Sequence, residues 1–200
     1  MTFELRTKTA SGDPILLRPL VDADAPALEA AIARFSNRSR YLRFFNGAPT
    51  LPPMVMRKLT EVDGILHLAW VAVDENTGEV IGAVHAMRED ASDETGELAM
   101  GLVDEWQGKG IARLLIALLA ADAQARGMTG FKADVLWENR KGRALVAALE
   151  AEATGSDNGV AHYRIDIAHV LELFGDRVQD GALQSIMPAI ESGAVQAAAA

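Results

Sequence analysis

The stretch Trp106-Gln107-Gly108-Lys109-Gly110-Ile111-Ala112 joins a predicted strand to a predicted helix and carries two glycines at the junction. The helix is expected over Ile111 to Arg126, with apolar residues at helical spacing, and Gly127 follows it. Glycine lets the backbone approach a ligand closely, and the first N–H groups of a helix carry the positive end of its dipole. The stretch therefore predicts an anion cradle that fits a pyrophosphate. A tight turn that uses glycine only for its geometry remains the alternative.

Two common phosphate-binding motifs do not fit this junction. The dinucleotide fingerprint G-x-G-x-x-G needs a third glycine, and only Gly108 and Gly110 are present. The phosphate-loop motif needs Gly-Lys followed by Ser or Thr, and the chain has no such tripeptide. The junction is therefore not that of either nucleotide-binding fold.

The rest of the chain alternates between strand and helix patterns. A strand is expected over residues 97–103, before the junction, and a hairpin over residues 67–87 with its turn at Glu75-Asn76-Thr77-Gly78. Residues 15–20 are expected to form an edge strand, because Pro19 lies near its end. Two further strands are expected over residues 131–137 and 160–167, the second after a turn at residues 155–159.

Helix patterns occupy the segments between these strands. Asp22 or Asp24 is expected to cap a helix that runs to Phe35, and Pro52 and Pro53 mark the start of another. Helices are also expected over residues 139–149 and, as one or two helices, over residues 168–190. The predicted organisation is one domain over residues 13–167, followed by a C-terminal helical extension and alanine-rich tail over residues 168–200.

The composition is that of a globular protein and excludes several classes. The chain has 200 residues, with 19 Lys and Arg against 28 Asp and Glu, and a net charge of -9. This acidic excess disfavours nucleic-acid and anionic-membrane binding, which depend on clustered positive charge. With no cysteine, thiolate chemistry is impossible, and the four histidines lack metal-ligand spacing, so no metal is expected. No run of 18 apolar residues and no signal-like start occur, so a cytoplasmic protein is expected.

Several motifs together resemble the GNAT family of N-acetyltransferases. Residues 107–112 are similar to its pyrophosphate motif Gln/Arg-x-x-Gly-x-Gly/Ala, in the same place between a strand and a helix. The resemblance is greatest to the bacterial protein lysine acetyltransferase branch and covers about Leu16 to Leu149. The segments that carry it, in the branch's order, are Leu17–Leu20, Ser39–Phe45, Leu59–Asp63, Asp104–Gly110 and Glu138–Arg140.

The resemblance implies an α/β (α+β) fold, with a mixed and mostly antiparallel sheet flanked by helices, and acetyl-CoA as cosubstrate. Backbone N–H groups of residues 107–112 would hold the pyrophosphate, and the pantetheine arm would lie where two strands splay, at a bulge that Gly101 marks. Lys109 and Arg113 lie one helical turn apart and are candidates for phosphate contacts, although Arg113 also suits a solvated surface. The donor-binding residues implied are Leu102, Val103, Gln107, Gly108, Lys109, Gly110, Ile111, Ala112, Arg113 and Asn139.

Acetyl transfer to an amine also needs a base. A lysine amine has a pKa of about 10.4, so roughly one molecule in a few thousand is neutral at pH 7. Strand alternation places Glu97 on one face with Ala99, Gly101 and Val103, and its offset from Trp106 resembles that of the branch's catalytic glutamate. Glu97 is therefore the predicted general base, with an exposed glutamate at a strand start as the alternative.

The resemblance places a backbone N–H near Leu102 as the donor to the oxyanion. It leaves the general acid unassigned, because neither Tyr41 nor Tyr163 matches the family's position. The motif Leu149-Glu150-Ala151-Glu152 departs from the Leu-Gly-Phe that relatives carry there, which leaves that end of the acceptor site open.

The function expected is transfer of acetyl to a primary amine, with a protein lysine as the leading acceptor. A small-molecule amine, or a non-catalytic acyl-CoA-binding regulatory module, are the alternatives. Residues 40–45 either shape the acceptor pocket or a regulatory contact, or form a helix buried through its aromatic residues with the arginines outward. Acidic residues 89–97 either favour cationic acceptors or form a solvated loop. Residues 168–200 are expected to act as a lid or a dimer contact, in a monomer or homodimer.

Overall fold

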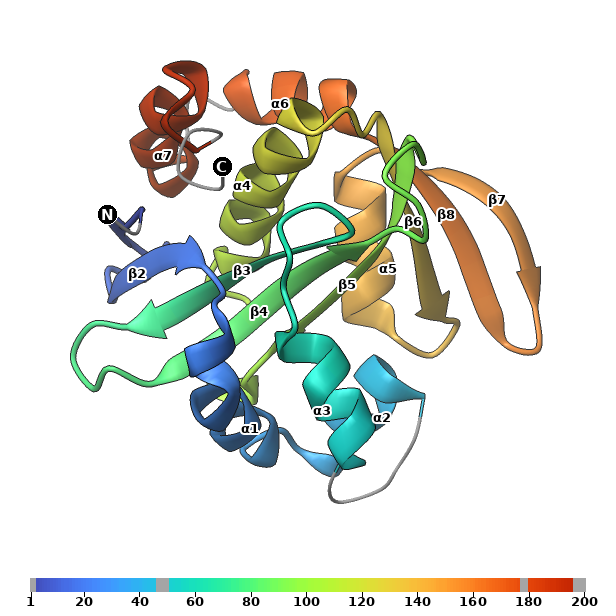
Figure 1. The fold of residues 1–200 in the computed structure, drawn as a ribbon, viewed down its shortest axis with the longest axis horizontal. Helices are drawn as coiled ribbons and strands as arrows, with labels where there is room; N and C mark the ends of the chain where they lie inside the picture. Colours follow the sequence, from blue (N-terminus) through green and yellow to red (C-terminus); the bar gives the residue numbers. More distant parts are fainter. Residues whose placement is uncertain (1–2, 46–50, 177–179, 196–200) are drawn as a thin grey trace.

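The computed structural model describes residues 3–45, 51–176 and 180–195, so the predicted alanine tail lies outside the described residues. An eight-stranded sheet runs through the molecule in the order β1-β2-β3-β4-β5-β6-β8-β7 (Figure 1). Every neighbouring pair in the sheet is antiparallel except β5 and β6, which are parallel. The strands are β1 (Leu5–Lys8), β2 (Pro14–Pro19), β3 (His67–Asp74), β4 (Val80–Met87), β5 (Thr95–Leu102), β6 (Gly130–Leu136), β7 (Glu152–Asp157) and β8 (Val160–Asp166). The prediction of a mixed, mostly antiparallel sheet is confirmed.

Helices cover both faces of this sheet. Gly101 on β5 lies against Phe35, which follows α1, whereas Trp70 on β3 donates its Nε1–H to Asp122 of α4 at 3.1 Å. The register of β3, β4 and β5 puts these two strand residues on opposite faces, so α1 and α4 cover opposite faces. The helices are α1 (Ala25–Ala33), α2 (Asn37–Phe44), α3 (Pro53–Thr60), α4 (Ile111–Ala125), α5 (Arg140–Ala148), α6 (Ile167–Gly175) and α7 (Gly181–Glu191), with short 3-10 turns η1 (Asp22–Asp24) and η2 (Asp104–Trp106).

α4 is enclosed on nearly every side. It packs on β3 and β4 and is covered by α6 and α7, so side chains from Leu114 to Ala121 are fully buried. The two C-terminal helices place Val170, Phe174, Leu183 and Ile186 in the same core at 0% exposure. Residues on both sides of the predicted boundary at 167/168 therefore share one core. No described helix is long and apolar enough to cross a membrane.

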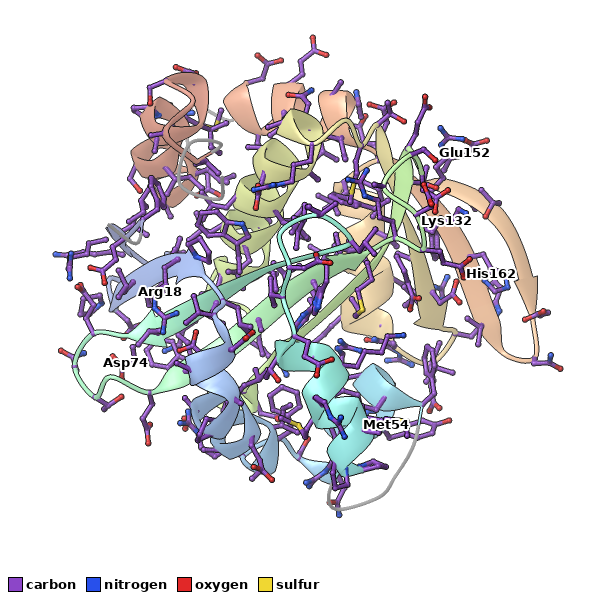
Figure 2. The ribbon with its side chains drawn as sticks, in the orientation of Figure 1. Arg18, Met54, Asp74, Lys132, Glu152 and His162 are labelled. Carbon is purple, nitrogen blue, oxygen red and sulfur yellow. The ribbon has the colours of Figure 1, made fainter. Side chains whose placement is uncertain are left out.

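The structure corrects two expectations near the N-terminus. β2 is not an edge strand, because the four-residue β1 pairs with it from Leu5↔Leu17 to Lys8↔Pro14. The prolines stand at the ends of β2 and leave its interior free to pair on both sides. Asp24 does not cap α1; its carboxylate accepts two bonds from Arg18, which is labelled in Figure 2, at 2.6 and 2.7 Å and one from the Val21 N–H at 3.0 Å.

β7 was also missed by the pattern. All six of its residues are exposed, so it carries no apolar alternation, and its last residues lie inside the expected turn at residues 155–159. The actual turn is short, with Asn158 at φ 44 and Gly159 at φ 82. The hairpin, the strand before the glycine junction and the helix after it are confirmed within a residue or two.

Candidate active site

β5 and β6 pair over only three residues and then diverge. The parallel register runs from Thr95↔Gly130 to Glu97↔Lys132 and stops there, with Lys132 labelled on β6 in Figure 2. Beyond this point β5 stays paired with β4 up to Leu102, and β6 stays paired with β8. The sheet is therefore open between β5 and β6 from Glu97 onward, as the resemblance implied.

Backbone groups on the unpaired edge of β5 point into this opening. The Val103 N–H donates to the Ile81 carbonyl at 2.9 Å, so at this point the chain faces β4. Hydrogen-bonded and non-hydrogen-bonded pairs alternate along antiparallel strands, which aims the N–H groups of Met100 and Leu102 away from β4 and into the opening. Val103 itself is 3% exposed and does not line the cleft, so its predicted contact with the donor is not supported by its position.

The register of β4 and β5 also corrects the role expected of Gly101. Pairing runs without a shift from Gly82↔Leu102 to Met87↔Glu97, so Gly101 marks no bulge. A Cβ on Gly101 would lie 2.8 Å from the Phe35 ring. Glycine is required at position 101 because the Phe35 ring packs directly against the backbone of β5 there.

A cleft of about 480 Å³ lies between α2, α5 and the start of α4. Phe35, Ser39, Leu42 and Arg43 form one wall, and residues of α5 form the other. The predicted donor-binding residues that it brings together are Leu102, Gln107, Gly108, Gly110, Ile111, Ala112, Arg113 and Asn139. Val103 and Lys109 are the two that do not line it.

The glycine junction forms the predicted cradle at one end of this cleft. Gly108 and Gly110 have φ of 79° and 88°, a region that other residues rarely adopt, and Gly110 is the N-cap of α4. The N–H groups of Arg113 and Leu114 reach back to the Gly110 carbonyl at 3.1 and 3.5 Å. The preceding N–H groups lie at the positive end of the helix. No described atom lies within 4 Å of a Cβ placed on Gly108, so the approach is open.

The two cationic side chains beside the cradle, Lys109 and Arg113, each form an ion pair with a carboxylate. Lys109 turns away from the cleft: its Nζ lies 3.1 Å from Asp13 and 4.5 Å from the Trp106 ring centroid. Hydrogen bonds from Ser11 and Lys109 lower the pKa of Asp13 to about 2. Arg113 lines the cleft, and its Nη2 pairs with Asp180 at 2.9 Å. A phosphate contact by Lys109 is thus not favoured by its orientation, whereas Arg113 stands beside the cradle.

Gln107 fastens the cradle to three elements. Its Nε2 donates to the Leu102 carbonyl at 3.0 Å and to Ser39 Oγ at 3.3 Å. Its Oε1 accepts from Lys141 Nζ at 2.8 Å. The side chain therefore connects the end of β5 with α2 and α5, across the cleft.

Asn139 occupies the N-cap of α5 and faces the opening. Its Oδ1 accepts from the Gly142 N–H at 2.9 Å, which leaves the Nδ2 group for other contacts. A Cβ on Gly142 would lie 2.7 Å from that Nδ2, so the amide is closely held. The cap fixes Asn139 where the resemblance implies a donor contact.

A second pocket, of about 130 Å³, continues the opening toward Glu97. β5 contributes Glu97 and the residues up to Met100, and β6 contributes Ala133, Asp134 and Val135. Glu97 is exposed and makes no ion pair with any described residue. The structure thus places a carboxylate at the point where the two strands separate, next to the donor cleft.

The buried-aromatic alternative for α2 is right for Phe44, which packs against the core, and wrong for the other two aromatic residues. Tyr41 and Phe45 are 37% and 47% exposed, whereas Arg40 is 8% exposed and donates to the Phe35 carbonyl at 3.1 Å. Arg43 lies over Gly101 and lines both pockets. The inward side of α2 also meets the Phe35 carbonyl and the cleft, which suit guanidinium groups better than aromatic rings.

Two features of the site had no role in the sequence-based prediction. Asp104 accepts hydrogen bonds from the Ser36 and Ser39 hydroxyls, both at 2.8 Å, and so ties α2 to the end of β5. His67 and His85 form a buried pair under α2 and α3, with Nε2 and Nδ1 at 3.0 Å. The Ser36-to-Ser39 spacing is a helix N-cap signal, but nothing local pointed to Asp104 as their partner.

The C-terminal helices do not cover the cleft. No described residue of α6 or α7 lines either pocket, so the lid over the acceptor groove is not what the structure shows. Instead α7 approaches the cradle from the side through the Asp180–Arg113 pair. Within the described ranges, no group of three or more His, Asp or Glu side chains is arranged to hold a metal ion.

Comparisons with known proteins agree with this geometry. A family model described as acetyltransferase (GNAT) domain matches residues 15–152. Acetyltransferase Pat of Mycolicibacterium smegmatis is 30% identical over 161 residues, which are 80% of this chain and 48% of that protein. The chain thus spans about half the length of that relative.

Solved structures show the same fold. The GNAT domain of S. lividans PAT has a TM-score of 0.77 and 27% identity, covering 82% of this chain and 96% of that one. Spermidine N-acetyltransferase from Vibrio cholerae, solved with CoA and spermine, has a TM-score of 0.61 and 19% identity over 78% of this chain and 98% of that one, and shares the fold. The chain belongs to the GNAT acetyltransferase family.

Proposed function

We propose that this protein transfers the acetyl group of acetyl-CoA to a primary amine, with a protein lysine as the acceptor. The observation that carries the proposal is the continuity of the site. The cradle at the start of α4 opens into the cleft along β5, and the cleft leads to Glu97 where β5 and β6 separate. The name of the Mycolicibacterium relative and the S. lividans domain support the lysine acetyltransferase branch.

The donor is held mainly by backbone groups. N–H groups of residues 107–112 face the pyrophosphate at the positive end of α4. The pantetheine arm lies against the free edge of β5, where Leu102 offers its N–H and Asn139 its amide. Arg113 provides a cation beside the phosphates, which compete with Asp180 for its guanidinium group.

Glu97 serves as the general base. It accepts a proton from the acceptor ammonium, directly or through a water, and leaves the amine with a free electron pair. The nitrogen then bonds to the thioester carbon, the carbon–sulfur bond breaks, and the thiolate of CoA leaves. The N–H groups of Met100 and Leu102, aimed into the opening, stabilise the negative charge that develops on the carbonyl oxygen.

The test is transfer of labelled acetyl from acetyl-CoA into a cell extract that is then separated by size. Label in the protein fraction is expected, whereas label only in small molecules would favour a small-amine acceptor. Binding of acetyl-CoA without any transfer would favour a regulatory module. Glu97→Gln is expected to lower kcat by about 100-fold or more while calorimetry shows unchanged acetyl-CoA binding. Glu29→Gln, at an exposed glutamate of α1 that lines neither pocket, is the matched control and should leave kcat unchanged.

A further inference from the structure

Arg43 stands where three cavities meet. It lines the donor cleft of about 480 Å³, the pocket of about 130 Å³ at Glu97, and a small cavity of about 20 Å³ that it shares with His85. The first two are the path that the donor and the acceptor take under the proposed function. The guanidinium of Arg43 is therefore placed at the point where the two substrates meet.

The guanidinium has no polar partner among the residues that the structure describes. The Arg43 guanidinium lies over the Phe44 ring, whose centroid is 4.9 Å from Cζ. Arg18 and Arg113, in contrast, pair with Asp24 and Asp180 at 2.6 and 2.9 Å. Arg43 is thus a cation whose five N–H donors remain available.

The groups around Arg43 do not neutralise it. Glu97 is the carboxylate that attracts it, yet the two side chains form no ion pair. Burial lowers the pKa of Arg43 to about 10, which still leaves it charged at neutral pH. Burial, together with Arg43 and His67, lowers the pKa of His85 well below its usual value, so His85 is neutral.

The histidine pair also fixes which atom of His85 is an acceptor. The Nδ1 of His67 lies 3.0 Å from the Glu61 carbonyl, which only accepts, so this nitrogen carries the proton. His67 Nε2 must then accept from His85 Nδ1, and the lone pair of His85 stays on Nε2. His85 therefore adds no positive charge and no donor to the cavity it shares with Arg43.

A half-buried cation without a polar partner has lost part of its hydration, and a ligand with a matching anion offsets that loss. The planar fork of a guanidinium matches a carboxylate, which accepts two parallel hydrogen bonds. The pocket at Glu97 has room for a group of several heavy atoms, since it equals about four waters at ~30 Å³ each. These features together specify the chemistry of the missing partner.

We propose that Arg43 binds a carboxylate of the substrate at the junction of the donor cleft and the Glu97 pocket. This inference rests on the proposed function and refines its substrate class. The carboxylate has two sources: the far end of a dicarboxylic acyl group on CoA, such as succinyl, or the amine acceptor itself. In either case the chemistry is unchanged: nitrogen bonds to the thioester carbon, and CoA leaves as the thiolate.

The donor arm of the test compares succinyl-CoA with butyryl-CoA, which has the same chain length and no carboxylate. Calorimetric binding and transfer are both measured on the full chain. If the donor supplies the carboxylate, succinyl-CoA should bind at least about tenfold more tightly, and Arg43→Met should abolish the preference. Arg57→Met, at an exposed arginine of α3, is the control and should keep it.

The acceptor arm uses acetyl-CoA with Nα-acetyl-lysine and with its amide, which differ only in the free carboxylate. If the acceptor supplies it, kcat/KM should be at least about tenfold higher for the free acid, and Arg43→Met should remove the difference. Arg43→Lys keeps the charge but not the fork, so it should retain part of the preference.

A preference in either arm that depends on Arg43 supports the inference. No preference in both arms, or a preference that Arg43→Met leaves intact, overturns it. Acetyl-CoA binding and transfer without a carboxylate preference would overturn this inference alone. Failure of every CoA thioester to bind would overturn the proposed function as well. Circular dichroism and the acetyl-CoA affinity of Arg43→Met show whether this variant is folded. If it is not, the same comparisons are made with Arg43→Lys.

Discussion

Ser36 and Asp104 are joined by two hydrogen bonds, one from the Ser36 N–H at 2.9 Å and one from its hydroxyl at 2.8 Å. The hydroxyl oxygen of Ser36 also accepts from the Ser39 N–H at 3.1 Å and caps α2. A carboxylate from the end of β5 therefore holds the first turn of the helix that carries Arg43. The position of α2 over the cleft depends on this connection across 68 residues of chain.

Asp104→Asn is expected to weaken this attachment. An amide can accept with its oxygen, but its nitrogen cannot replace the carboxylate oxygen that receives the Ser36 N–H. Because Asp104 is exposed, the loss in free energy of unfolding should be about 1 kcal/mol, below the roughly 1.5–3 kcal/mol of a hydrogen bond to a charged group. Urea denaturation measures it, and Glu105→Gln, which removes only an exposed ion pair, should change stability by less than about 0.5 kcal/mol.

The effect of Asp104→Asn should depend on pH. Burial alone would raise the pKa of Asp104, but hydrogen bonds from Ser36 and Ser39 outweigh it and lower the pKa. A carboxyl whose pKa is lowered on folding stabilises the native state above its unfolded pKa, about 3.9, and loses that effect as pH falls through the folded pKa. The difference between wild type and variant should be constant from pH 7 to about 5 and shrink below about pH 4. A difference that grows on acidification would contradict this.

Gly108 and Gly127 form a matched pair for testing the cradle. Both have positive φ, 79° and 78°, and neither has a described atom within 4 Å of an added Cβ. Alanine at either position should lower the free energy of unfolding by roughly 1–2 kcal/mol, because the left-handed backbone is strained for it. Only Gly108→Ala should weaken acetyl-CoA binding, by roughly fivefold or more in calorimetry. Equal affinities in the two variants would show that the cradle does not hold the donor.

Gly101 and Phe35 should show strong coupling. An alanine Cβ at position 101 would lie 2.8 and 2.9 Å from two ring atoms of Phe35, closer than real contacts. Gly101→Ala should therefore cost about 1–3 kcal/mol of unfolding free energy. Phe35→Leu removes the ring and with it the clash. The double variant should therefore lose about 1 kcal/mol less unfolding free energy than the sum of the two single losses. Additive losses, measured by urea denaturation, would mean that the ring does not explain the glycine.

Features fixed by neighbours in the chain could be predicted from the sequence. The glycine turn before α4, the helix that follows and the β3–β4 hairpin all depend on local spacing and turn chemistry, and each was found where expected. The four-residue β1 is too short for its alternation to stand out, and the fully exposed β7 has no apolar face, so both were missed. Pairing partners, rather than the residues themselves, define these two strands.

Orientations that depend on distant residues could not be predicted. Lys109 turns from the cleft because Asp13 lies beside it, 96 residues away in the chain. Arg40 is buried because it meets the Phe35 carbonyl that ends the preceding segment, although its helix reads as basic and solvent-facing. Residues 168–200 were expected to form a lid over the acceptor groove or a dimer contact, whereas α6 and α7 pack on α4.

Asp180 and the donor are expected to compete for Arg113. The Arg113–Asp180 pair lies in a cavity of about 1200 Å³ between β1, α4 and α7, beside the cradle. Asp180→Asn removes the charge but keeps a side chain that can cap α7, as Asp180 does through the Leu183 N–H. Acetyl-CoA should then bind roughly two- to fivefold more tightly, because a partly exposed ion pair of this kind is worth about 0.5–1 kcal/mol.

The gain from Asp180→Asn should shrink at high salt, since it comes from a partly exposed charge. Asp176→Asn changes another carboxylate lining the same cavity that makes no ion pair with a described residue, and it serves as the control. If both variants tighten binding equally, the effect is one of net charge and not of Arg113. If Asp180→Asn has no effect while Arg113→Gln weakens binding, Arg113 reaches the phosphates without giving up Asp180, and the competition does not exist.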